Sequence, residues 1–320
     1  MDTLQINEKP QKRKYYSRQV KRVTYYTLML ALPILQFCFF WVYVNFSSIT
    51  MAFNSYKDGA NGYIATFVGF DNFKVAFKKL GTDTYMITNS LKYFALHMLV
   101  GIPLALIFSY YIYKKMSGAG LFRVVLYMPH IISTLVFSLL FKYMVTNVYT
   151  TLMAEVTGEV VVLGLLDNPE TQLATVLFFN VWIGFGTEVL LYSGTMSGIS
   201  ESIVESAELD GANRVQEFFY ITLPMIYPTL TTFIITSVAG IVTNRLNLVS
   251  LYGNQANHLS SIGYYLFVAA QDPNLTLSSS SAFRLNYPAL AAMGLIFTAI
   301  IFPLTWITRK LMQKYGPSAD

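Results

Sequence analysis

Few residues of this chain have side chains suited to chemistry, and they are widely scattered. The one cysteine, Cys38, lies in an apolar run and has no second thiol with which to form a disulfide. The three histidines, His97, His130 and His258, are far apart and lack nearby cysteine or acidic companions, so we expect no metal site. The sequence contains no G-x-x-x-x-G-K-[ST] segment for nucleotide phosphates. If the activity of the protein requires energy, that energy therefore comes from another polypeptide or from an ion gradient.

Glu188 differs from the other acidic residues because it lies deep in an apolar segment. It stands about 17 residues into the run 171–198, which at 1.5 Å per helical residue places it well inside a hydrocarbon layer. A carboxylate at that depth is a candidate functional group or a member of an ion pair. We expect a static partner for Glu188 on a second subunit rather than direct contact with a substrate.

A second polar group lies near the end of the apolar run 225–249. Asn244, Arg245 and Asn247 are unusual residues for a membrane interior, and Lys142 falls near the outer end of another run. These four are the candidate substrate-binding residues. Two interpretations stay open, because the cations can line a polar cavity or can extend along the membrane interface to the lipid headgroups.

The segment 200–224, SESIVESAELDGANRVQEFFYITLP, is long for a connection that only reverses the chain. Ser202 and Glu205 have the spacing of a capping box, and Gly211 then predicts the end of that helix. Asn213 and Gln216 predict the start of a second short helix. We therefore expect two short helices joined by a glycine turn, which either receive another protein or rest on lipid as an amphipathic element.

The composition indicates that these residues are carried by membrane-spanning helices. The 320-residue chain is 54% hydrophobic and 12% charged, against about 25% charged residues in a soluble domain. Its mean hydropathy is +0.46. These values exclude a disordered protein, a nucleic-acid-binding protein and an ordinary cytosolic enzyme, and they predict a polytopic membrane protein. Six apolar runs are long enough to span a membrane, so we expect an all-α protein with six transmembrane helices. The expected spans are 24–56, 89–113, 121–145, 171–198, 225–249 and 289–308.

Basic residues predict how the spans are oriented. The segments 1–23, 114–123, 199–224 and 309–320 together carry 14 Lys and Arg, and the segments between the other span ends carry five. Because cations collect in cytoplasmic loops, we expect both termini inside the cell. The predicted organisation is a basic cytoplasmic segment 1–23, a transmembrane domain 24–308 that contains the loop 200–224, and a cytoplasmic tail 309–320.

The loop 200–224 resembles the EAA loop of binding-protein-dependent ABC importer permeases. That pattern has E-A-A, three further residues, G, nine further residues and I-x-L-P. The matching positions, with serine in place of the first alanine, are Glu205, Ser206, Ala207, Gly211, Ile221, Leu223 and Pro224. The resemblance extends over most of the chain and is nearest to the carbohydrate permeases of the polysaccharide and multiple-sugar type.

This resemblance implies the type I permease fold of ABC importers and a set of partners. They are a second permease, two cytoplasmic ATPase subunits that hold the ATP and Mg²⁺, an extracellular solute-binding protein, a carbohydrate and the lipid bilayer. The loop would dock on the ATPase, with Glu205 contacting it and Gly211 setting the bend. The implied substrate is an oligosaccharide, and the implied location is a bacterial cell membrane.

Three other functions are alternatives to sugar import. The same machinery could import another solute, such as an amino acid or phosphate. An intramembrane enzyme would need convergent catalytic groups, but the spans offer one deep acid and scattered histidines. A stand-alone secondary transporter would carry internal repeats and paired broken helices, and the sequence has neither.

Overall fold

The computed structural model describes residues 12–317 except 60–61, 159, 161 and 272–286. The parts of the predicted segments 1–23 and 309–320 that fall at residues 1–11 and 318–320 therefore lie outside the described residues. Among the residues that the structure describes, six helices are long and apolar enough to cross a membrane, as predicted. They are Val20–Ala52, Tyr85–Tyr113, Thr134–Thr157, Gln172–Met196, Tyr227–Tyr252 and Tyr287–Tyr315.

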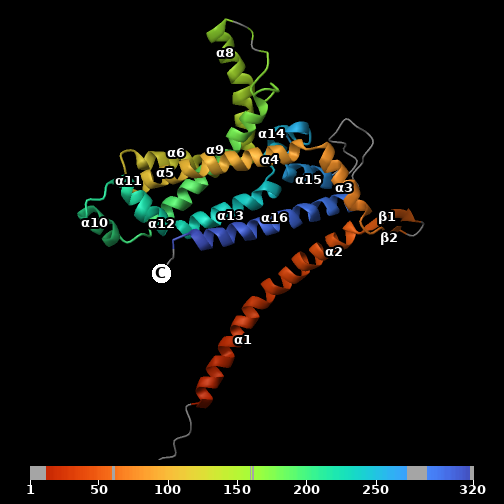
Figure 1. Ribbon diagram of the computed structural model, residues 1–320, viewed down its shortest axis with the longest axis horizontal. Coiled ribbons are helices and arrows are strands. Elements are labelled where there is room, and N and C mark those ends of the chain that lie inside the picture. The colour runs from red at the N-terminus through yellow and green to blue at the C-terminus, as the bar shows by residue number, and fades with distance from the viewer. Residues whose placement is uncertain (1–11, 60–61, 159, 161, 272–286, 318–320) are drawn as a thin grey trace, which may run out of the picture.

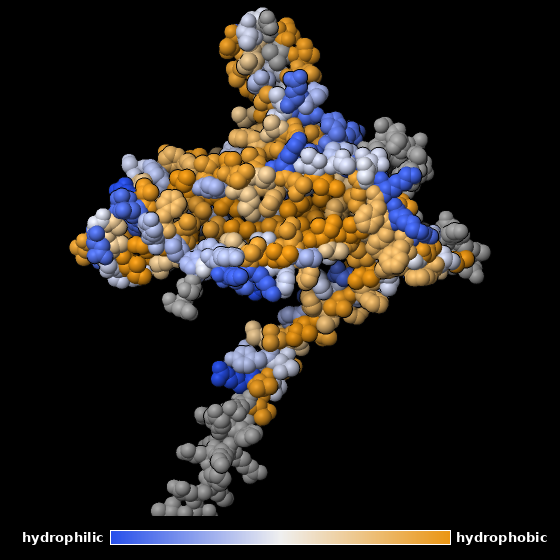
Figure 2. Space-filling model, in the orientation of Figure 1, coloured by the Kyte–Doolittle hydropathy of each residue, from blue (hydrophilic) through white to orange (hydrophobic). Residues whose placement is uncertain are grey.

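Long helices run side by side to form an elongated body (Figure 1). The body helices are α4 (Tyr85–Leu96), the π-helical turn η2 (His97–Gly101), α5 (Ile102–Tyr113), α6 (Ala119–Ile131), α9 (Gln172–Met196), α13 (Tyr227–Thr243) and α16 (Tyr287–Tyr315). The continuous helical segment α4–η2–α5 extends the length of the body. The space-filling view shows hydrophobic side chains over the middle of the body, as a surface next to lipid or another subunit requires (Figure 2).

Two helical segments leave this body. One contains α1 (Lys12–Gln36), the π-helical turn η1 (Phe37–Val42) and α2 (Tyr43–Ala52). The other, which we call the arm, contains α7 (Thr134–Tyr143), η3 (Met144–Val148) and α8 (Tyr149–Thr157). The most apolar window of the first segment has none of its residues buried within the chain. Its side chains therefore need lipid or a partner subunit to cover them.

The third predicted span, 121–145, is wrong as a single helix. Helix α6 ends at Ile131, and Ile132 and Ser133 adopt extended backbone conformations before α7 begins at Thr134. Pro129 supplies no backbone N–H, which weakens the helix just before this break. The membrane-length helix instead continues through η3 and α8 into the stretch 146–170 that we expected to be a loop.

The end of the body opposite the loop 200–224 has a different construction, and we call it the hairpin end (Figure 1). Strands β1 (Asn54–Gly59) and β2 (Gly62–Phe67) pair antiparallel there, with Asn54 opposite Phe67. Helix α3 (Asp71–Thr82) follows this hairpin. The first span therefore ends at Ala52, before the predicted residue 56, because the next residues turn into the hairpin.

The chain after α13 completes the hairpin end. Its helices are α14 (Leu248–Tyr252), the 3₁₀ turn η5 (Asn257–Leu259) and α15 (Ile262–Gln271). The last helix, α16, continues to Tyr315, so most of the predicted tail 309–320 is helical. At the other end, which we call the loop end, the loop 200–224 joins α9 to α13 (Figure 1).

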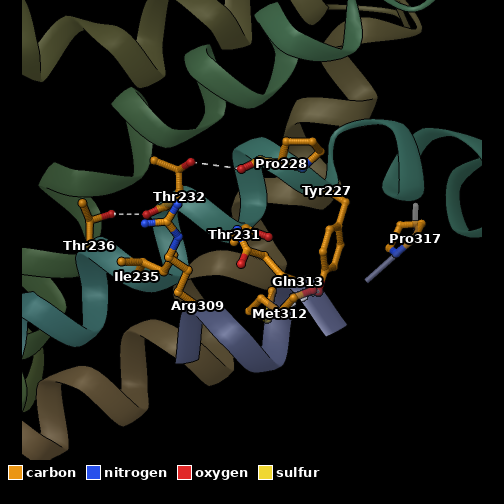
Figure 3. Close-up of a pocket in the computed structure, with 10 residues that line it drawn as sticks. All are labelled: Tyr227, Pro228, Thr231, Thr232, Ile235, Thr236, Arg309, Met312, Gln313 and Pro317. Atoms are coloured by element: carbon orange, nitrogen blue, oxygen red, sulfur yellow. Dashed lines mark hydrogen bonds between the residues drawn. The ribbon is translucent and has the colours of Figure 1, made fainter. Parts of the chain in front are cut away.

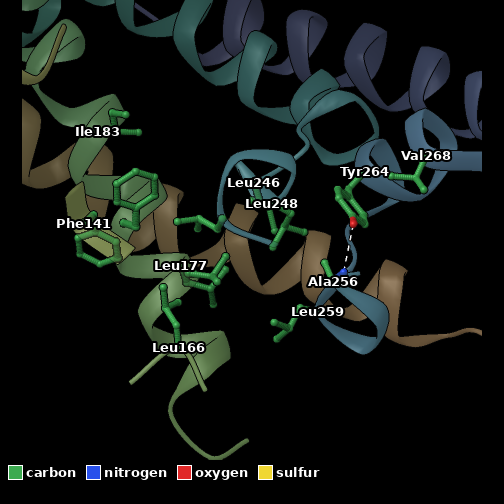
Figure 4. Packing of buried hydrophobic residues seen from close by; sticks show 13 residues of the cluster. Phe141, Leu166, Leu177, Ile183, Leu246, Leu248, Ala256, Leu259, Tyr264 and Val268 are labelled. Carbon is green, nitrogen blue, oxygen red and sulfur yellow. Dashed lines mark hydrogen bonds between the residues drawn. The ribbon is translucent and has the colours of Figure 1, made fainter. Parts of the chain in front are cut away.

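Buried apolar residues form three clusters along the body, one of which joins the arm to α9, α14 and α15. In this cluster Phe141 of the arm lies against Phe179, with ring centroids 4.6 Å apart (Figure 4). The Tyr264 hydroxyl donates to the Gly253 carbonyl at 2.7 Å and accepts from the Ala256 N–H at 3.1 Å. Burial raises the pKa of this phenol, so it remains the protonated donor that the Gly253 contact requires.

Candidate functional site

The loop 200–224 folds as two short helices joined by a glycine turn, as predicted. Helix α10 (Glu201–Leu209) ends with Gly211 in the left-handed conformation, at φ +83°. The Gly211 N–H donates to the Glu208 carbonyl at 3.1 Å, and the Ala212 N–H donates to the Ala207 carbonyl at 2.9 Å. These two bonds define a Schellman motif, which favours glycine because the left-handed conformation crowds a Cβ.

The second loop helix begins with a complete capping box. Helix α11 (Arg214–Glu217) is preceded by Asn213, whose side chain accepts from the Gln216 N–H at 2.9 Å. The Gln216 side chain accepts from the Asn213 N–H, also at 2.9 Å. The predicted capping role of Ser202 is wrong, since α10 begins at Glu201 with Ser200 at its N-cap.

The motif residues divide into an exposed group and an inward group. Glu205 and Ser206 are exposed, whereas Ala207 is buried. After α11 the segment continues through the π-helical turn η4 (Phe218–Thr222) and α12 (Leu223–Met225). Ile221 of η4 and Leu223 of α12 are half-buried, and Pro224 lies in the first turn of α12. The loop also exposes large apolar side chains, namely Ile203, Leu209, Val215, Phe219 and Tyr220. An exposed apolar patch on preformed helices is typical of a protein-binding surface.

Glu188 lies within the body and has its partner in this chain. The His97 Nε2 is 2.6 Å from Glu188 Oε1, and both residues are buried. The expectation of a partner on a second subunit is therefore wrong. On its other side, His97 Nδ1 lies 3.3 Å from the Ser237 hydroxyl. A proton on Nε2 directed at Glu188 leaves Nδ1 free to accept from Ser237.

These groups line a cavity of about 210 Å³ between α4, η2, α9 and α13. Its polar lining comes from Tyr93, Thr236 and Asn244 in addition to the His97–Glu188 pair and Ser237. A π-helical turn adjoins the cavity, since His97 begins η2 and Gly101 ends it. Such turns often occur at functional sites, where they redirect a side chain.

The sequence contains a signal for the His97–Glu188 pair, which is the similar depth of the two residues in their spans. His97 and Glu188 are 91 positions apart, and each lies well within an apolar span. A buried carboxylate needs a donor, so matching it with an ionisable residue at similar depth on another span would have suggested this pair.

The predicted substrate-binding residues do not form one group in the structure. Asn244 lines the 210 Å³ cavity, whereas the Arg245 guanidinium is exposed and lies 4.4 Å from the centre of the Phe267 ring. Asn247 donates to the Asn180 side chain at 2.8 Å. The Lys142 ammonium donates to the Leu251 carbonyl at 2.8 Å. Asn247 and Lys142 thus hold α14 in place, and of these four residues only Asn244 lines this cavity.

A larger cavity of about 570 Å³ lies between α13 and the last turns of α16 (Figure 3). Its wall includes Tyr227, Thr232, Thr236 and Arg309, and the Tyr227 hydroxyl donates to the Met312 carbonyl at 2.9 Å. Thr236 lines this cavity and the smaller one as well. The exposed residues of α13 share one face, and all of them are proline or threonine: Pro228, Thr232, Thr236 and Thr243. A hydroxyl-bearing face is more typical of a polar passage than of lipid contact.

We predict that Gly101→Ala displaces the His97 ring and destabilises the protein. A Cβ at Gly101 would lie 2.9 Å from His97 Cδ2, and overpacking of this kind costs about 1–3 kcal/mol. The melting temperature of the detergent-solubilised protein should fall by at least about 3 °C. The control is Gly184→Ala in α9, where a Cβ meets nothing within 4 Å, so this variant should keep or raise the melting temperature. Equal melting temperatures for the two variants would contradict the packing described.

Within the described part of the chain, six membrane-length helices, a cavity lined by the buried His97–Glu188 pair and an exposed helical loop at one end define a polytopic membrane permease. The chain belongs to the family described as "Binding-protein-dependent transport system inner membrane component", whose model matches residues 97–316. The predicted family and the predicted six-helix fold are confirmed.

Named relatives include the "Probable ABC transporter permease protein YesP" of Bacillus subtilis (strain 168), which is 32% identical over 204 residues. That match covers 62% of this chain and 63% of the relative, so it spans less than two thirds of YesP. The "Arabinooligosaccharides transport system permease protein AraP" of the same organism is 24% identical, and the match covers 88% of this chain and 86% of AraP.

The fold resembles that of a solved bacterial ABC transporter chain. That transporter is described as "involved in the import of the acidic polysaccharide alginate". The TM-score is 0.73 at 20% sequence identity, and the match covers 94% of this chain and 99% of the other chain. At this level of identity the comparison supports the fold alone.

Proposed function

We propose that this protein is a permease subunit of an ATP-driven importer of neutral oligosaccharides. The observation that carries the proposal is the preformed loop 200–224, which exposes Glu205 at the end of a membrane-embedded body. A short helix in a groove makes a rigid mechanical link to a partner. Glu205 is placed to form a charge-assisted contact with a basic residue of an ATPase.

The proposed assembly contains a second permease, two ATPase subunits that bind ATP and Mg²⁺, and an extracellular solute-binding protein. The unburied apolar surfaces of α1 and α2 support a second permease as a partner, since they need cover beyond this chain. One of the structurally similar transporters is described "in complex with alginate pentasaccharide-bound periplasmic protein". This description fits a solute-binding protein as the external partner.

Sugar recognition is proposed for the cavity that contains Asn244. Its lining offers an amide, hydroxyl groups and the His97–Glu188 pair, which suit the hydroxyl groups of a neutral sugar. At about 210 Å³ the cavity is smaller than ligand pockets of about 300–1,000 Å³. It therefore holds only part of an oligosaccharide. The threonine face of α13 and the 570 Å³ cavity continue the polar passage toward the loop end.

Mutation of the loop 200–224 should reduce the stimulation of ATP hydrolysis by sugar. Glu205→Ala removes the proposed contact, and Gly211→Pro prevents the positive φ of +83° that the turn requires. In the assembled complex, the rate of sugar-stimulated ATP hydrolysis should fall about tenfold or more. A tenfold change corresponds to a free-energy difference of about 1.4 kcal/mol. Glu201→Ala is the control, since Glu201 is an exposed acid of the same helix outside the motif. Normal stimulation in both motif variants would exclude the proposed coupling role.

The orientation is tested with a single cysteine at the loop end. Lys314 is exposed near the end of α16, and Cys38 is also exposed, so the test variant is Lys314→Cys with Cys38→Ser. Gly316 is unsuitable because a Cβ there would collide with the Tyr227 ring. An impermeant maleimide should label Lys314→Cys only after the cells are opened, as the excess of cytoplasmic cations predicts. Labelling in intact cells would reverse the proposed orientation.

Uptake measurements separate the proposed sugar contacts from the exposed cation. Asn244→Leu should reduce uptake of labelled maltodextrins or arabino-oligosaccharides at least about tenfold, since an unpaired sugar hydroxyl costs about 1–3 kcal/mol. Arg245→Gln should change uptake by less than about tenfold, because the guanidinium lies over Phe267 outside the cavity. Membrane levels are compared by immunoblot. Loss of uptake in Arg245→Gln with normal uptake in Asn244→Leu would contradict this assignment.

A further inference from the structure

Lys114 connects both helices of the loop 200–224 to the body. It follows the last residue of α5, and its ammonium nitrogen lies 2.8 Å from Glu217 Oε2 in α11. The same nitrogen lies 3.5 Å from Glu208 Oε1 in α10. The side chains of Lys114 and Glu217 are 16% and 2% exposed, whereas that of Glu208 is 60% exposed. The strong contact is therefore the enclosed one with Glu217, which is far less screened by solvent.

A second contact joins the same two elements. The Tyr110 hydroxyl in α5 donates to the Arg214 carbonyl in α11 at 3.0 Å. The Tyr110 ring meets the Phe218 ring edge to face, with centroids 5.1 Å apart. Helix α11 is thus held to the end of α5 by an ion pair and a hydrogen bond, and the first residue of η4 adds an aromatic contact. Glu208 adds a weaker link from α10.

The other end of α5 adjoins the polar cavity. The helical segment that ends at Lys114 includes His97 without interruption, because η2 passes directly into α5. The 17 residue steps between them correspond to about 25 Å at 1.5 Å per residue. The Ser109 hydroxyl of α5 lies 2.5 Å from the Ala105 carbonyl of its own helix and 3.1 Å from the Val189 carbonyl, which is next to Glu188 in α9. One helix therefore links the loop to the His97–Glu188 pair.

We propose that Lys114 is the positioning residue through which movement of the loop 200–224 passes into α5 and reaches the polar cavity. This proposal rests on the proposed function and adds the route by which the loop acts. Rigid helices and ion-pair contacts are the kind of element that carries such coupling. The Lys114–Glu217 pair suits the role because separating a buried ion pair leaves an uncompensated charge, which is strongly unfavourable, so the two partners move together.

The test uses the purified complex of the full chain with its second permease, ATPase subunits and solute-binding protein. The variants are Lys114→Met and Glu217→Gln, and Glu208→Gln is the matched control at the exposed partner. The measured quantity is the number of sugars transported per ATP hydrolysed in proteoliposomes, with a mixture of maltodextrins and arabino-oligosaccharides as probe. Lys114→Met and Glu217→Gln should lower this ratio about tenfold, while Glu208→Gln keeps it within about twofold of the unaltered complex.

This ratio separates coupling from a merely structural role. If the pair only aids folding or assembly, uptake and ATP hydrolysis fall together and the ratio is unchanged, which overturns the proposal. If a single variant fails to assemble, the double variant Lys114→Met with Glu217→Met decides, because it leaves no unpaired buried charge. Assembly with continued ATP hydrolysis and a low ratio supports the proposal, and a normal ratio refutes it. An unaltered complex without sugar-stimulated ATP hydrolysis would instead refute the proposed function.

Discussion

The structure depends on one constraint, which is that a charge placed in an apolar helical body must have a partner close by. An unpaired buried carboxylate is strongly unfavourable. Among the described residues, three carboxylates are buried in or beside the membrane-length helices, and one of them, Asp83, is paired with Lys79 four positions earlier. Glu188 is paired with His97, and Glu217 is paired with Lys114. Both pairings join residues about a hundred positions apart, so they fix helices that have no local reason to meet.

These pairings give α5 a central position. At one end the segment carries His97 beside the cavity, and at the other it carries Lys114 beneath the loop helices. The Asn180 side chain makes a comparable connection near the hairpin end, where it donates to the Leu246 carbonyl and accepts from Asn247. The His97–Glu188 pair joins two segments of the body. The Lys114–Glu217 pair joins the end of α5 to α11, and Asn180 joins α9 to the turn before α14. The apolar clusters then fill the spaces between them.

The parts of the fold that could be predicted are those determined by nearby residues. The glycine turn at Gly211 and the capping box at Asn213 depend on contacts between residues at most five positions apart, so spacing alone was sufficient. Apolar length likewise predicted six spans. The His97–Glu188 pair was missed because no spacing rule connects different helices. The break at Ile132 and Ser133 was missed because both flanking segments are apolar. The contact of Arg245 with Phe267 could not be predicted because the two residues lie on different segments.

The most direct test of the account is to purify the unaltered protein from its native membrane and to measure ATP hydrolysis by the proteins that accompany it. The account predicts that an ATPase copurifies and that a solute-binding protein loaded with maltodextrins or arabino-oligosaccharides stimulates hydrolysis. Alginate oligosaccharides should not stimulate it, because none of the described residues that line the 210 Å³ cavity is a lysine or arginine. Absence of a copurifying ATPase, or stimulation by the acidic sugar alone, would contradict the account.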